Sequence, residues 1–437
     1  MTATKCRALT AALAAIMALS SCGVIQEQEI NDEGPLYKST VTGQAPDPGS
    51  RAEKKKDTKT KSSDSKAEPA DTDVKQTDTD KKDTSAASDK VQKMVDEMSV
   101  EEKVGQMFIV RADTLEEDVA VDIGVSWVDD DMKKTLSDYH VGGVIYFANN
   151  CYDPDQLLSL SEDLQASSDI PLFIGIDEEG GSVARIANNP EFGVDGYDSM
   201  LSIGNTGNTD NAEAVGETIG AYLSEYGINL DFAPVADIFT NPSNTVIGNR
   251  SFGTDAETVS SMVSACIDGF HSQDIMTCLK HYPGHGDTSG DTHTGYVQVT
   301  KTWDELLKEE LVPFIDNIDK TDMIMAAHLT LPNVTSDGLP ASLSKELLTD
   351  KLRGELGYDG VIITDSLLMG AVADNYSSAE SAVKVVNAGA DIILMPYSLS
   401  SAYNAVVKAV NDGSIPEERI NESVTRILSL KEKYGLI

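Results

Sequence analysis

Short apolar runs alternate with amphipathic stretches along most of this chain. Eight runs of four or five residues are rich in Val, Ile, Leu and Met, a pattern typical of parallel strands buried on both faces. Five of the stretches between them repeat apolar residues every three or four positions, which predicts helices with one buried face. The expected strands are residues 107–110, 144–147, 172–176, 230–233, 275–279, 323–327, 360–363 and 392–395. The expected helices are residues 212–226, 256–270, 303–318, 345–356 and 417–434.

This alternation predicts an α/β fold, a (β/α)8 TIM barrel over residues 91–437. Gly227 and Gly357 follow two expected helices, where a C-cap glycine belongs. Pro416 stands where a first-turn proline would begin another helix. A doubly wound open sheet has the same alternation and is the alternative.

The N-terminal 22 residues have the features of a bacterial lipoprotein signal peptide. Lys5 and Arg7 precede a short apolar run, and residues 19–22 fit a lipid-attachment box that ends at Cys22. The run is too short for a stable membrane span. We therefore expect an extracytoplasmic protein, anchored to the cell membrane by lipid on Cys22. An ordinary secretory signal with a chance cysteine is the alternative.

Residues 23–90 contain few large apolar side chains and are rich in Lys, Asp, Ser and Thr. Such a composition predicts a disordered linker, because it cannot bury enough surface to offset the entropy lost on ordering. Residues 93–437 carry 20 Lys and Arg against 57 Asp and Glu, a net charge of −37. So acidic a domain repels phosphate backbones, which excludes nucleic acid as the expected partner.

Polar residues that could carry chemistry stand directly after the expected strands. They are Asp177, Lys280 with His281, His328 and Asp365. In a barrel the carboxyl ends of all strands meet at one mouth, so these groups should lie together. Asp365 could serve as a nucleophile, a metal ligand or a helix N-cap. The company of the other groups favours catalysis.

Two arginines extend the expected mouth. The motif DEEGG at 177–181 is followed by Arg185, and a carboxylate there can accept hydrogen bonds from two vicinal sugar hydroxyls. Arg185 could orient that carboxylate or contact the ligand. Arg250 lies in a polar loop of a domain that is poor in arginine. Simple ion pairing with neighbouring acids is the alternative for both arginines.

The segment 280–293 holds three of the six histidines and is broken by proline and glycine. Asp291 and His293 are two positions apart, so on extended backbone their side chains point the same way. A carboxylate bonded to an imidazole fixes the ring and stabilises its protonated form. His293 could then donate and accept protons beside another carboxylate. A histidine that merely caps a turn is the alternative.

We expect no metal and no other cofactor. A zinc site built from His281, His285 and His293 would lack the helical spacing of zinc hydrolases, and Lys280 would repel the cation. Without Cys6 and Cys22 the remaining cysteines, Cys151, Cys266 and Cys278, are irregularly spaced. They form neither a disulfide framework nor a zinc motif. One disulfide between two of these cysteines is the alternative, but we expect free, buried thiols.

These motifs, in this order, resemble glycoside hydrolase family 3, and more narrowly its bacterial β-N-acetylglucosaminidases. The resemblance covers roughly residues 91–437. The motifs that carry it are DEEGG at 177–181 with Arg185, NLDFAPV at 229–235, IGNRSF at 247–252, KHYPGHG at 280–286, DTH at 291–293 and VIITD at 361–365. The family more often has Gln at position 178 and Ser at position 292.

The resemblance implies a retaining hydrolase that removes terminal β-linked N-acetylglucosamine from peptidoglycan fragments or related oligosaccharides. It implies that Asp365 is the nucleophile of a covalent intermediate and that His293, held by Asp291, is the general acid/base. Most glycosidases use a second carboxylic acid there. It also implies a set of sugar-binding residues. These are Asp177, Arg185, Arg250, Lys280 and His281.

Other functions stay open. A histidine acid/base leaves less negative charge near an incoming phosphate, so a β-N-acetylglucosaminide phosphorylase is one alternative. A β-glucosidase-like activity and a surface lipoprotein that only binds sugar are the others. We expect a monomer with one catalytic domain, a carbohydrate as its partner, and contact with the membrane through the N-terminal lipid only.

Overall fold

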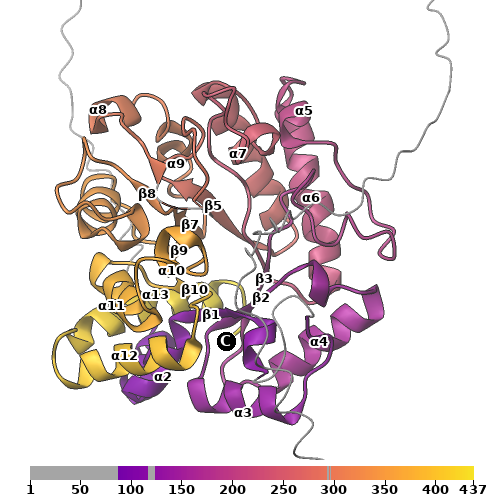
Figure 1. Cartoon of the computed structure of the whole chain (residues 1–437). Helices are drawn as coiled ribbons and strands as arrows, with labels where there is room; N and C mark the ends of the chain where they lie inside the picture. The colour runs from indigo at the N-terminus through magenta and orange to yellow at the C-terminus, as the bar shows by residue number, and fades with distance from the viewer. Residues whose placement is uncertain (1–86, 117–123, 293–294, 296) are drawn as a thin grey trace, which may run out of the picture. The chain divides into compact units, whose positions relative to one another are not determined.

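Eight parallel strands follow one another around a barrel in the order β10-β1-β2-β3-β4-β5-β7-β9 (Figure 1). The two ends of this order meet, because Ile363 of β9 bridges Ile392 beside β10. This closure confirms the (β/α)8 barrel, and each of the eight strands overlaps an expected apolar run. The strands are β1 (Phe108–Arg111), β2 (Gly143–Tyr146), β3 (Phe173–Ile176), β4 (Leu230–Asp231), β5 (Met276–Tyr282), β7 (Met323–Ala326), β9 (Val361–Thr364) and β10 (Ile393–Leu394). A separate pair, β6 (Val297–Gln298) and β8 (Leu329–Thr330), forms a small second sheet.

This computed structural model describes residues 87–116, 124–292, 295 and 297–437. They belong to a unit that spans Asp80–Ile437. The expected signal peptide, Cys22, the linker up to residue 86 and His293 lie outside the described residues.

Helices surround the strands, and their ends follow the sequence signals closely. Gly227 and Gly357 have φ angles of 72° and 79°, the left-handed conformation expected after a helix. Pro416 lies one position earlier than expected, as the N-cap residue of α13. The α-helices are α1 (Asp89–Glu97), α2 (Val100–Gln106), α3 (Asp130–Tyr139), α4 (Pro154–Ala166), α5 (Met200–Gly204), α6 (Thr209–Glu225), α7 (Ala256–His271), α8 (Trp303–Leu306), α9 (Val312–Asp316), α10 (Gly370–Ala373), α11 (Ser378–Ala388), α12 (Leu399–Asn411) and α13 (Glu417–Lys433). The shorter 3₁₀ turns are η1 (Ala112–Leu115), η2 (Ala148–Asn150), η3 (Gly248–Arg250) and η4 (Ala341–Leu343), and η5 (Glu346–Glu355) is a π-helix.

The expected helix over residues 303–318 is two short helices instead. Pro313 stands in the first turn of the second piece, α9. A proline lacks the N–H that a continuous helix needs and clashes with the carbonyl four residues earlier, so the first piece ends before it. The spacing of apolar residues predicted the buried face correctly, but it did not indicate the break between α8 and α9.

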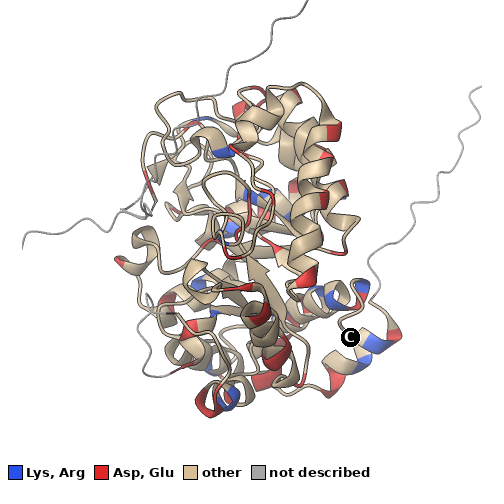
Figure 2. Ribbon diagram, turned by 90° about the vertical axis from the view of Figure 1, so that its right-hand side faces the viewer, with Lys and Arg blue, Asp and Glu red and all other residues tan. Residues whose placement is uncertain are grey.

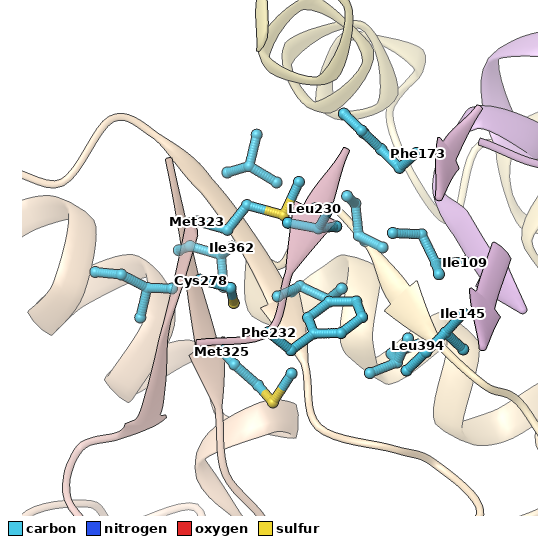
Figure 3. Close-up of a cluster of buried hydrophobic side chains, with 14 of the residues drawn as sticks. Ile109, Ile145, Phe173, Leu230, Phe232, Cys278, Met323, Met325, Ile362 and Leu394 are labelled. Carbon is cyan, nitrogen blue, oxygen red and sulfur yellow. The ribbon is translucent and has the colours of Figure 1, made fainter. Parts of the chain in front are cut away.

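The inside of the barrel is a packed apolar core (Figure 3). Every one of the eight strands contributes to the cluster, and its members are almost fully buried. A filled interior leaves no passage along the barrel axis, so polar chemistry is confined to the strand ends. The labelled core residues are Ile109, Ile145, Phe173, Leu230, Phe232, Cys278, Met323, Met325, Ile362 and Leu394.

Helix α13 lies across the amino-terminal ends of the strands, which we call the base. Its Lys431 is fully buried and donates to the side-chain oxygen of Gln106 at 2.8 Å and to the carbonyl of Gly142 at 3.0 Å. Burial lowers the pKa of Lys431 to about 7. Nearby, the buried Asp322 accepts hydrogen bonds from Lys433 and His271. The base is thus held by buried polar contacts that serve stability.

Acidic side chains are spread over many helices of the barrel rather than gathered in one patch (Figure 2). None of the helices within the described part of the chain combines the length and apolar character that a membrane span requires.

Candidate active site

Asp177 and Lys280 meet at the mouth of the barrel. Asp177 directly follows β3, and the Lys280 Nζ lies 2.7 Å from its Oδ1. The expected strand ended at residue 279, before Lys280 and His281, which is wrong, because β5 continues to Tyr282. The strand is prolonged by its pairing with β7, where Tyr282 stands opposite Ala326. This extension directs the Lys280 ammonium towards the end of β3.

Beneath this pair lies a buried carboxylate, Glu179, to which the sequence analysis gave no role. Its Oε1 is 2.6 Å from the Lys280 Nζ, and both of its oxygens accept hydrogen bonds from Arg250, at 2.8 and 2.7 Å. Burial would raise the pKa of Glu179, but Arg250 and Lys280 more than offset it and hold the pKa below its ordinary value. Arg250 is therefore ion-paired, as the alternative reading held, and the pair is part of the site.

Glu178 fixes the loop that carries Arg185. Its buried carboxylate accepts the backbone N–H groups of Arg185, Ile186 and Ala187, at 2.5, 2.9 and 2.8 Å. The hydroxyl of Tyr222 donates to it at 2.8 Å. Burial raises the pKa of Glu178, although these four donors act against the shift. A Gln could accept only part of these bonds, so the acid found here suits the loop's conformation.

Arg185 stands beside Asp177 with one face against an aromatic ring. The guanidinium Nη2 lies 3.8 Å from the Asp177 Oδ2, and the group stacks over Phe147 at 5.4 Å from the ring centre. Arg111 stacks on the same ring at 4.1 Å. The side chains of Asp177 and Arg185 remain 19 % and 22 % exposed. A ligand can therefore reach both groups from solvent.

His281 is oriented by Asp237, which the sequence analysis missed. The Asp237 Oδ2 lies 2.6 Å from the His281 Nδ1, and the backbone N–H of His285 donates to Oδ1 at 2.6 Å. Burial would raise the pKa of Asp237, but His281 and His285 hold it below its ordinary value. The contact with a carboxylate places the ring proton on Nδ1, and the other ring nitrogen, Nε2, lies 3.5 Å from the Arg250 Nη2. Asp237 lies beyond β4 and directly follows Val235 and Ala236, whose backbone pairs with Lys280, so its place after an apolar segment could have revealed it.

Asp365 stands at the tip of β9, as expected. Its backbone N–H donates to the carbonyl of Ala326 at 2.9 Å, and its Oδ1 accepts the N–H of Ser366 at 2.7 Å. The next helix, α10, begins at Gly370, so the N-cap alternative is wrong. Burial would raise the pKa of Asp365, but the imidazoles of His328 and His281 more than offset it and hold the pKa below its ordinary value. Asp365 is thus an ionised carboxylate at neutral pH.

His328 holds the turn that follows Asp365. The imidazole is fully buried, with its Nε2 2.8 Å from the carbonyl of Ser366 and its Nδ1 2.7 Å from the hydroxyl of Ser342. The expectation that the residue after β7 joins the mouth is correct, but its ring faces the backbone of the turn. His328 therefore positions Asp365 instead of facing solvent.

The segment of the expected proton-transfer pair lies against the helix after Asp365. The carbonyl of Thr292 accepts the backbone N–H of Ala371 in α10 at 3.2 Å, and Thr292 is buried. Asp291 is partly buried next to it. His293 is outside the described residues, so the pairing with Asp291 stays a prediction. The backbone contact nevertheless brings this segment to the side of the mouth where Asp365 stands.

The three remaining cysteines are not suited to nucleophilic chemistry. Cys151, Cys266 and Cys278 are free and buried, as expected. Burial raises the pKa of all three thiols, that of Cys151 to about 12. A thiol with so high a pKa is no nucleophile at neutral pH. Within the described ranges, no group of three or more His, Cys, Asp and Glu side chains is arranged to hold a metal ion.

Known proteins are similar to this chain in both sequence and fold. The chain is 36% identical over 332 residues to Beta-hexosaminidase A of Pseudoalteromonas piscicida, covering 69% of this chain and 55% of that protein. It is 32% identical over 313 residues to Beta-hexosaminidase LpqI of Mycobacterium tuberculosis, covering 69% of this chain and 78% of that protein. The structure of a glycoside hydrolase family 3 beta-N-acetylglucosaminidase from Paenibacillus sp. str. FPU-7 matches with a TM-score of 0.72 and 38% identity, covering 78% of this chain and 63% of that one.

The chain thus spans only about half the length of the first of these relatives. Its residues 99–430 match the Glycosyl hydrolase family 3 N terminal domain. This match takes in the whole mouth, from the β3 tip with Asp177 to the β9 tip with Asp365. By this match and by its fold, the chain belongs to glycoside hydrolase family 3.

Proposed function

We propose that this protein is an exo-β-N-acetylglucosaminidase, a hydrolase that releases terminal β-linked N-acetylglucosamine from peptidoglycan fragments or related oligosaccharides. The observation that carries the proposal is Asp365, an ionised carboxylate at the same barrel mouth as the cluster of Asp177, Lys280 and Arg250. A carboxylate at one mouth with partly exposed hydrogen-bond acceptors and donors, Asp177 and Arg185, suits a sugar. The names of the similar β-hexosaminidases support the same substrate class.

In this proposal the reaction proceeds with retention. Asp365 attacks the anomeric carbon, the glycosidic C–O bond breaks, and a covalent glycosyl ester forms on the carboxylate oxygen. The pKa of Asp365, held low by His328 and His281 against the effect of burial, keeps the attacking oxygen unprotonated. Water then attacks the anomeric carbon and releases Asp365.

His293 is proposed to supply the protons for both steps. It protonates the departing glycosidic oxygen and later takes a proton from the attacking water, while Asp291 holds the imidazole. The two-residue spacing supports the pairing, and the Thr292–Ala371 contact supports a location near Asp365. A histidine suits this role because its ordinary pKa, roughly 6.5, lies near neutral pH.

Asp177 is proposed to bind the hydroxyls of the terminal sugar. Its two oxygens have one cation each, Lys280 at 2.7 Å and Arg185 at 3.8 Å, and the carboxylate remains open to solvent. His281 and Arg250 line the same corner. The Nε2 of His281 lies 3.5 Å from the Nη2 of Arg250. Such a rigid, charged corner would fix the sugar ring while Asp365 reacts.

A panel of nitrophenyl glycosides tests this function. We expect turnover of the β-N-acetylglucosaminide, with the β-anomer as the first product seen by NMR. Release of sugar 1-phosphate in phosphate buffer would point to a phosphorylase instead. Mass spectrometry after incubation with a slow fluorinated substrate should find the sugar on a peptide that contains Asp365. No turnover of any member of the panel would contradict the proposal.

We also propose that the protein is an extracytoplasmic lipoprotein anchored through Cys22. The sequence around Cys22 supports this, since it combines a basic start, a short apolar run and a lipid-attachment box. Labelling of cells with a fatty-acid analogue tests it. Label should enter the natural protein and be absent from a Cys22→Ser variant.

A further inference from the structure

Two exposed aromatic side chains stand on neighbouring loops of the barrel mouth. In the part of the chain that the structure describes, three large apolar side chains are strongly exposed: Trp127 (70 %), Tyr397 (76 %) and Tyr152 (49 %). Trp127 lies in the loop from β1 to α3, and Tyr152 lies in the loop from β2 to α4. Since β1 and β2 are adjacent strands, these two loops share one side of the mouth.

The two loops are tied into one surface. The side chain of Gln156 accepts the backbone N–H of Tyr152 at 2.9 Å and donates to the carbonyl of Ser126 at 3.1 Å. A single side chain therefore joins the backbone at Tyr152 to the backbone beside Trp127. Asn150 adds a second tie, because its amide donates to the carbonyl of Val125 at 3.0 Å. The two aromatic residues are thus presented on a fixed scaffold.

This surface continues into the loop of Arg185. The amide of Asn189 donates to the carbonyls of Cys151 and Tyr152, at 2.8 and 3.2 Å. Asn189 lies two positions after Ala187, the last of the three residues that Glu178 holds by their backbone N–H groups. The aromatic residues and the Asp177 corner are therefore parts of one connected set of loops.

The charge around the two rings restricts what can bind there. The described residues of these loops, 111–116, 124–131, 147–157 and 185–192, contain eight Asp and Glu against two arginines, Arg111 and Arg185, and each arginine is already ion-paired with an aspartate. A ligand with carboxylates would be repelled from this surface. The apolar face of an uncharged pyranose ring, by contrast, packs well against an aromatic ring and hides it from water.

We propose that Trp127 and Tyr152 form an aromatic rim that binds the sugar units beyond the cleaved bond, and that these units belong to an uncharged N-acetylglucosamine oligosaccharide. This inference rests on the proposed function and narrows it. It selects chitin-like chains over muropeptides, whose lactyl and peptide carboxylates the rim would repel.

Turnover of N-acetylglucosamine oligomers of different length tests the rim. We expect Trp127→Ala and Tyr152→Ala each to lower kcat/KM for the pentamer roughly 5- to 30-fold, the effect of losing one stacked sugar contact. Turnover of the dimer, which is too short to use the whole rim, should change less than twofold. The matched variants Trp127→Phe and Tyr152→Phe keep a ring at each position and should retain most of the pentamer activity.

Equal loss on dimer and pentamer, or no loss on either, would overturn the rim. If the alanine variants turn over a muropeptide more slowly but the pentamer at the natural rate, the choice of an uncharged chain is overturned. Calorimetry separates the rim from the proposed hydrolase function, because it measures binding of the pentamer to the natural protein and to Trp127→Ala without relying on turnover. If nitrophenyl N-acetylglucosaminide is not cleaved, the proposed function fails. The rim still stands if Trp127→Ala weakens pentamer binding, and falls if it does not.

Discussion

Replacement of Asp237 by Asn should impair the enzyme through a residue that we place outside direct contact with substrate. Asp237 accepts three N–H groups, two from His281 and one from His285. An Asn has the same shape but turns one acceptor into a donor. Facing that donor, the His281 ring would move its proton from Nδ1 to Nε2. The atom that His281 presents towards Arg250 and the sugar would then change from acceptor to donor.

The size of the effect follows from the bond that is lost. A hydrogen bond to a charged group contributes about 1.5–3 kcal/mol. With about 1.4 kcal/mol for each factor of ten, kcat/KM should fall about 10- to 150-fold. Because His281 is proposed to bind the sugar, most of the loss should appear at low substrate concentration. The assay is hydrolysis of nitrophenyl β-N-acetylglucosaminide over a range of concentrations, with urea unfolding measured in parallel.

The chain offers a matched control in Asp322→Asn. Asp322 is also a buried carboxylate with a histidine partner, since its Oδ2 lies 2.8 Å from the His271 Nε2. It lies at the base, at the opposite end of the barrel. Both variants should reduce the free energy of unfolding, but the Asp322 variant should keep the natural kcat/KM. If the two variants lose activity to the same extent, the reasoning about the His281 tautomer is refuted.

Three further predictions concern single side chains. Asp365→Asn should abolish turnover and leave sugar binding intact, because the covalent step needs a carboxylate. Calorimetry with N-acetylglucosamine measures the binding. Turnover by this variant at the rate of the natural protein would contradict the prediction. His293→Ala should lower the rate about 10²- to 10⁴-fold on poor leaving groups and much less on dinitrophenyl glycosides. An equal loss on both would count against the acid role. Burial disfavours the Lys431 ammonium in the folded protein, so the free energy of unfolding should increase as Lys431 loses its proton between about pH 7 and pH 10. This part of the pH dependence should be missing in Lys431→Met. Urea titrations at several pH values measure it.

The strands could be predicted because parallel barrel strands are buried on both faces and read as apolar runs. The same signal located Asp177 and Asp365, since each directly follows such a run. It placed the end of β5 too early, because Lys280 and His281 are polar and yet continue the strand. Their polarity is satisfied by Asp177 and Asp237, contacts that come from distant parts of the chain.

The parts of the site that were missed depend on partners far apart in sequence. Glu179 is separated by 71 positions from Arg250 and by about a hundred from Lys280, and nothing local marks it as different from Glu178. Only the fold shows that Glu178 holds a loop while Glu179 neutralises two cations. Asp237 could have been found by its place after β4, but its histidine partner is 44 positions away.

The base of the barrel has a practical consequence. The first described helices, α1 and α2, pack against α13 on that face, so the chain enters the fold at the end opposite to the mouth. A bead or sensor chip coupled through residues just before α1 would hold each molecule with its opening turned outward. Long glycans could then reach an immobilised layer without passing beneath it.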